Sequence, residues 1–88
     1  MTSAELMARA RQIELLAEEV DGCVDPSWSI ARSPDWRCAH ADQVRGDLDR
    51  WRAAARSSAR GLREEASLLR AQARRAAERE QAGVPQAW

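Results

Sequence analysis

The first apolar pattern along the chain has the three-to-four spacing of one helix face and predicts a helix over residues 3–21. Thr2 and Glu5, just before it, have the spacing of a capping box. Gly22 can take the left-handed conformation that ends helices. The apolar positions of this helix are Leu6, Ala10, Ile13, Leu16 or Ala17, and Val20.

A second, longer pattern predicts a helix over residues 36–82, with steps that alternate between four and three as in a coiled coil. Gly83 and Pro85 end this helix and leave residues 83–88 as a flexible tail. The apolar seam consists of Ala41, Val44, Leu48, Trp51, Ala55, Ser58, Leu62, Ala66, Leu69, Ala73 and Ala76.

Residues 22–35 contain two prolines and are predicted to form an irregular connection. They hold a near-repeat, Asp25-Pro26-Ser27-Trp28 and Ser33-Pro34-Asp35-Trp36, and each copy reads as a cap followed by Pro at the first helical position. We expect the first copy to make a single turn and the second to open the long helix.

The two patterns together predict an all-α antiparallel helical hairpin over residues 1–82, with a short first helix and a long second one. At the standard rise the helices span about 27 Å and about 63 Å. We expect Val20 to meet Val44, Leu16 to meet Leu48, Ile13 to meet Trp51, and Leu6 to reach Ala59 or Leu62. The predicted hairpin core is therefore Leu6, Ile13, Leu16, Val20, Val44, Leu48 and Trp51.

The unequal lengths leave the distal part of the long helix without a cover in its own chain, and an exposed apolar stripe normally marks an interface. We therefore expect a protein partner, either a second copy or another helical protein, and a four-helix bundle. The alternative is a distal helix that is Ala-rich and solvated. The predicted partner-binding residues are Leu62, Leu68, Leu69, Ala73 and Ala76.

Composition and charge support this fold. The chain has 44% hydrophobic residues but no Phe or Tyr, which favours helices over a sheet. Its formal net charge is zero, yet residues 1–31 carry six acids and two Arg, for −4, while the remainder carries +4. The two halves should attract each other. Acidic residues interleave with the Arg-rich stretch from Arg50 to Arg79, so a solvated face is favoured over a phosphate track, although nucleic-acid binding stays an alternative.

The sequence indicates no catalysis, metal or cofactor. Its one His, His40, leaves little acid–base chemistry near neutral pH, and no Cys-X-X-Cys spacing suggests a metal site. Cys23 and Cys38 flank the connection and could close a disulfide, or both could be reduced and buried. Charges occur every few residues, so neither a signal peptide nor a membrane span is expected.

The stretch Trp36-Arg37-Cys38-Ala39-His40-Ala41-Asp42-Gln43-Val44-Arg45-Gly46-Asp47-Leu48 resembles the bend of the WXG family of helical-hairpin proteins exported by type VII (ESX) secretion systems. Trp36, Arg37 and Cys38 stand at the Trp-X-Gly motif, with Cys replacing Gly. Val44 stands where the family has a bulkier residue. Arg45 and Leu48 match the family's Arg and next core position.

The resemblance implies a homodimer or heterodimer of two hairpins that is exported folded, without a cleaved signal peptide, from the cytoplasm. The family's Tyr-X-X-X-Asp/Glu export signal is absent because the chain has no Tyr. The resemblance therefore implies a chaperone-like partner that leaves with a signal-bearing protein. Competing readings are a self-associating coiled-coil adaptor, a phage-type structural protein, and an Arg-rich nucleic-acid-binding helix pair.

Overall fold

The first helix, α1 (Ser3–Gly22), begins at the predicted cap. The Thr2 side-chain oxygen accepts a hydrogen bond from the Glu5 backbone N–H at 3.1 Å, while the Thr2 hydroxyl donates to the Glu5 carboxylate at 3.2 Å. Thr2 has an extended backbone, so its side chain can turn back over the first helical turn and satisfy a donor that the helix leaves free. The predicted helix start is confirmed.

The end of α1 differs from the prediction, because Gly22 is inside the helix and does not turn the chain. Cys23 caps the helix with right-handed angles (φ −65°, ψ −25°), and no residue among 1–83 has a positive φ. The chain bends only slightly and enters a second helix, α2 (Asp25–Ala31), with Pro26 in its first turn. The prediction of an irregular connection over residues 22–35 is therefore wrong for the greater part of that segment.

The chain reverses direction after α2. Two turns follow, in which the Ser33 N–H donates to the Ile30 carbonyl at 3.1 Å and the Trp36 N–H to the Ser33 carbonyl at 3.2 Å. The long helix, α3 (Ala39–Gly83), begins at Ala39, so the second copy of the repeat makes the bend and does not open the helix.

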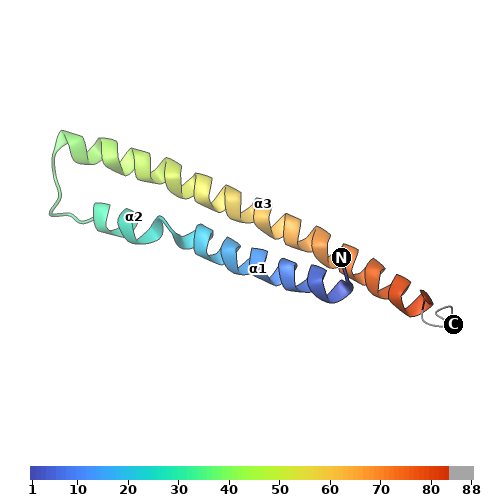
Figure 1. The fold of residues 1–88 in the computed structure, drawn as a ribbon. Coiled ribbons are helices and arrows are strands. Elements are labelled where there is room, and N and C mark those ends of the chain that lie inside the picture. The colour runs from blue at the N-terminus through green and yellow to red at the C-terminus, as the bar shows by residue number, and fades with distance from the viewer. Residues whose placement is uncertain (84–88) are drawn as a thin grey trace.

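In the computed structural model, which describes residues 1–83, these elements form an all-helical antiparallel hairpin (Figure 1). α1 and α2 follow each other along the same side of α3 and form one arm. The hairpin measures 75 × 14 × 13 Å. The predicted fold class is confirmed, and the predicted tail from residue 84 onward lies outside the described residues.

The register of the two arms is not the predicted one. Ser3 hydrogen-bonds Glu80, Glu14 pairs with Arg70, and Asp21 pairs with Arg63. α1 therefore lies along the C-terminal half of α3, while α2 lies beside the N-terminal half, which α1 was expected to cover. The predicted register assumed that the connection contributed no length, whereas α2 adds seven helical residues to the first arm.

Alanines form the contact between the arms. Ala10 and Ala17 on α1 and Ala59, Ala66 and Ala73 on α3 recur at intervals of seven and are almost completely buried. A repeat of seven keeps a residue on the same face of a packed helix. The 14 Å width of the hairpin leaves about 9 Å between the axes, a normal spacing for packed helices. The arms therefore touch through small side chains, and larger ones are pushed to the sides.

The predicted core residues divide accordingly. Leu6 and Leu48 are buried, as predicted, while Ile13, Val20 and Val44 are half-buried. Leu16 and Trp51, however, are 46% and 59% exposed, so their assignment to the core is wrong. The seam takes the neighbouring Ala17 instead of Leu16, and the half-buried Arg52 instead of Trp51, while Ala55 of the predicted seam is buried.

The stripe expected to be uncovered is covered by α1. Leu69, Ala73 and Ala76 are buried in one cluster with Leu6 and Ala10, and Met7 and Ile13 pack against its edge. The premise that these distal residues have nothing in their own chain to pack against is wrong, because α1 lies along the C-terminal half of α3.

This register exchanges the roles expected of two residues, since Leu69 was assigned to partner binding and Trp51 to the core. Leu69→Ala should lower the free energy of unfolding by about 2 kcal/mol, near the low end for a buried Leu because a two-helix core can partly collapse. Trp51→Ala should change it by less than about 0.5 kcal/mol, since that side chain is exposed. Urea denaturation of dilute protein followed by circular dichroism would measure both, with Leu68→Ala as the exposed control beside Leu69. Equal losses for Leu69→Ala and Trp51→Ala would contradict the structure.

Candidate protein-interaction surface

Trp28 attaches α2 to α3. Its indole N–H donates to Asp49 at 2.7 Å, and its ring lies between the guanidinium groups of Arg32 and Arg52, at 4.5 and 4.0 Å from the centroid. Asp25 binds Arg52 at 2.8 Å, and Arg32 also pairs with Asp49. The hydrogen bonds from Trp28 and Arg32 lower the pKa of Asp49. Cation–π and ionic contacts therefore hold α2 to α3 beside the buried Ala31 and Leu48.

Arg45 holds the bend between the arms. Its Nε donates to the Ala31 carbonyl at 2.5 Å, and its Nη2 donates to the carbonyls of both Ser33 and Trp36. The planar guanidinium offers five donors in a fixed fork, so one side chain can satisfy several carbonyls of a turn. This arrangement explains why α3 begins only after the bend has been completed.

The predicted bend motif lies around the Arg45 side chain. The Trp36 ring is 5.5 Å from the Arg45 guanidinium carbon, and Arg37 donates to the Pro34 carbonyl at 2.6 Å. Cys38 precedes α3, and both Cys38 and Cys23 are free and exposed, so neither a disulfide nor a pair of buried thiols is found. The motif residues belong to the bend, as predicted, although Arg45 organises it.

Removing the Arg45 guanidinium should destabilise the bend. Arg45→Ala leaves several carbonyls to water and should lower the free energy of unfolding by about 1–3 kcal/mol. Arg45→Lys should recover only part of the loss, since an ammonium lacks the planar fork. Thermal unfolding followed by circular dichroism would measure both, with the exposed Arg56→Ala as a control. A midpoint for Arg45→Ala equal to that of Arg56→Ala would contradict this role.

One side of the hairpin is ionic. Glu14–Arg70 and Asp21–Arg63 join α1 to α3, and each pair of partners on one helix is seven residues apart and so on one face. At the N-terminus of α1, the Ser3 N–H and hydroxyl donate to Glu80 at 2.9 and 2.8 Å and lower its pKa. The predicted attraction between an acidic first arm and a basic second one is realised in these contacts.

The other side holds exposed apolar side chains. Leu16 follows Glu14 by two residues and Leu68 precedes Arg70 by two, which on a helix turns each away from the ion pairs by about 200°. Leu16 is 46% exposed, and Leu68 and Trp51 are each 59% exposed. Exposed apolar side chains gathered on one side of a helical pair are typical of an interface.

The predicted partner-binding residues are only partly on this surface. Leu68 is exposed and Leu62 is half-buried, whereas Leu69, Ala73 and Ala76 belong to the hairpin core. Sequence reasoning missed Trp51 and Leu16. Ala17 and Ala55 could have indicated their exposure, because a seam of regularly spaced alanines brings the helices close together and excludes large residues beside it.

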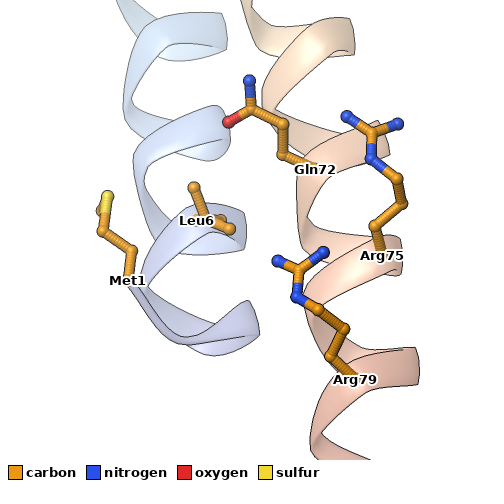
Figure 2. A pocket seen from close by; sticks show the side chains of 5 residues that line it. All are labelled: Met1, Leu6, Gln72, Arg75 and Arg79. Carbon is orange, nitrogen blue, oxygen red and sulfur yellow. The ribbon is translucent and has the colours of Figure 1, made fainter.

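A cleft of about 400 Å³ opens near the N-terminus of α1 (Figure 2). The buried Leu6 lies beside it, and Met1 lines it from the start of the chain. Gln72, Arg75 and Arg79 line it from α3, with Gln72 and Arg79 reaching toward α1. The cleft thus combines apolar walls with guanidinium groups, which suits an aromatic side chain.

The described residues offer no clear site for other chemistry. Among residues 1–83, no group of three His, Cys, Asp or Glu side chains lies close enough to hold a metal ion. His40 is exposed in the first turn of α3. The described helices also include none that combines the length and the apolar content needed to cross a bilayer.

Comparisons of the chain with protein-family models, curated proteins and solved structures find no match. The resemblance to WXG proteins consequently rests on the residues of the bend and on the hairpin pattern, and it stays a prediction.

Proposed function

We propose that the chain is a non-catalytic protein-binding hairpin, which packs its apolar side against a second helical hairpin in a four-helix bundle. The observation that carries this proposal is the exposure of Trp51 and Leu68 on α3, each 59% exposed although the hairpin core is already closed by α1. Large apolar side chains that the fold does not need gain most when a partner covers them.

The resemblance at Trp36-Arg37-Cys38 extends this proposal to a biological setting. In this setting, the chain is a chaperone-like component of a type VII secretion substrate complex. Its partner is a second WXG-like hairpin or the helical N-terminus of an effector. Support comes from the bend residues and from a hairpin shape that suits such pairing.

The ion pairs weigh against the nucleic-acid alternative. Arg52, Arg63 and Arg70 are engaged with acidic side chains of the first arm, so they are less available for phosphates. The adaptor and phage-type alternatives share the same interface and differ only in the partner.

Binding through the apolar side predicts the effect of a buried charge. Leu68→Glu should weaken association by at least about tenfold, because the carboxylate would lose its hydration in the interface. Leu15→Glu is the matched control, since Leu15 is 61% exposed and follows Ile13 by two residues, which turns it about 200° away from Ile13 on α1. Light scattering after size-exclusion chromatography would be measured for the chain alone and co-expressed with helical proteins encoded beside its gene. A monomer in every mixture would refute the proposal.

The secretion setting has its own test. The chain should appear in the culture medium at its full mass and should stay in the cells when the secretion ATPase is deleted. Mass spectrometry of medium and cell fractions would measure this, with a cytoplasmic protein as the control for lysis. Retention in both strains would leave a binding hairpin without a role in secretion.

A further inference from the structure

A row of residues follows α3 beside the alanine seam, and all of them are exposed except Asp47, which is half-buried. Its steps alternate between four and three, so its members share one face of a helix that packs against another helix. It spans about 48 Å. We call it the α3 row, and it consists of Asp47, Trp51, Ala54, Ser58, Gly61, Glu65, Leu68, Gln72, Arg75 and Arg79.

The spacing of the α3 row is the same when it is read backwards from its centre, between Gly61 and Glu65. An antiparallel copy of α3 would therefore place the two rows in register along their whole length. Asp47, whose carboxylate also pairs with Arg50 of the same helix, would then face Arg79 at the basic end of the row in the second copy. Opposite charges in facing positions favour this pairing and oppose a parallel one.

The same register brings a projecting side chain to a hollow. Trp51 is exposed and would face Arg75 of the second copy, which lines the cleft together with Leu6, Gln72 and Arg79. Figure 2 shows this cleft with its arginines on α3. Trp28 and Trp36 already lie against arginine side chains within the chain, so the contact is one that this protein uses elsewhere.

Gly61 lies at the centre of the row, in the middle of α3. A Cβ built there would meet nothing within 4 Å, and its φ is not positive, so the hairpin itself does not require glycine. Glycine inside a helix costs about 1 kcal/mol relative to alanine. A second helix that crosses at this point would explain the glycine, because without a side chain the two helix backbones can approach closely.

We propose that the hairpin forms a twofold homodimer in which α3 packs antiparallel against α3 of a second copy along the α3 row. Trp51 of each copy occupies the cleft at Arg75 and Arg79 of the other, and Asp47 faces Arg79. This inference rests on the proposed function and names its partner. Since the contact is isologous, each favourable pair occurs twice and the assembly closes at two copies.

Charge exchange tests the register. Arg79→Asp and Asp47→Arg should each raise the dimer dissociation constant about tenfold, because each places like charges opposite each other at two positions. The double variant Asp47→Arg/Arg79→Asp should return to within about threefold of the wild-type value. Arg74→Asp is the matched control, since Arg74 is exposed on α3 but outside the row. Sedimentation equilibrium would give the constants, and circular dichroism would confirm that each variant keeps its helicity.

Two further variants test the contact itself. Trp51→Ala should weaken the dimer about a hundredfold, as expected for an aromatic anchor lost twice. Gly61→Leu should leave the hairpin at least as stable yet weaken the dimer, because the added side chain occupies only open space in one copy. Both effects would support the proposed contact.

Three outcomes would overturn this inference. A dimer indifferent to the charge variants and to Trp51→Ala pairs through another surface. A monomer that binds a neighbouring gene product through Leu68 refutes the homodimer and leaves the proposed function intact. A monomer that binds no helical partner refutes both.

Discussion

The regular spacing of alanine along both arms is the constraint on which the rest of the structure depends. Because Ala10, Ala17, Ala59, Ala66 and Ala73 are the residues between the helices, the arms approach closely and leave no room for large side chains in the contact. The hairpin consequently has a thin core of small residues with a few leucines at its edge. The large side chains outside this core lie on one of the two sides of the hairpin, and their positions determine the surface that a partner would meet.

The two sides are unlike because the residues next to the seam are unlike. Acids of α1 and arginines of α3 fill one side and join the arms, while Leu16, Leu68 and Trp51 are left on the other. Near the bend, where α2 replaces α1, the contacts of Trp28 with Arg32 and Arg52 add to the burial of Ala31, Leu48 and Ala55. The ionic contacts therefore help to set the register and thereby leave the apolar side open.

A partner is still expected in this arrangement, but for a different reason. α1 covers the distal part of α3, so Leu69, Ala73 and Ala76 are buried in the core of the hairpin itself. The expectation of a partner now rests on one side of α3, where Trp51 and Leu68 are exposed and a cleft lies beside Leu6.

The sequence by itself determined the helices, the all-helical hairpin and the cap at Thr2, because these depend on local periodicity and on contacts within one turn. It also predicted Leu68 as a partner-binding residue, and Leu68 is exposed in the structure. Only the tertiary structure decided the register, the burial of Leu69 and the exposure of Trp51. The reason is that alanine and leucine look equally apolar in a pattern, whereas in a close contact only alanine fits. The helical state of residues 25–31 likewise depends on α3, since Trp28, Arg32 and Asp25 are held by partners far away in the chain.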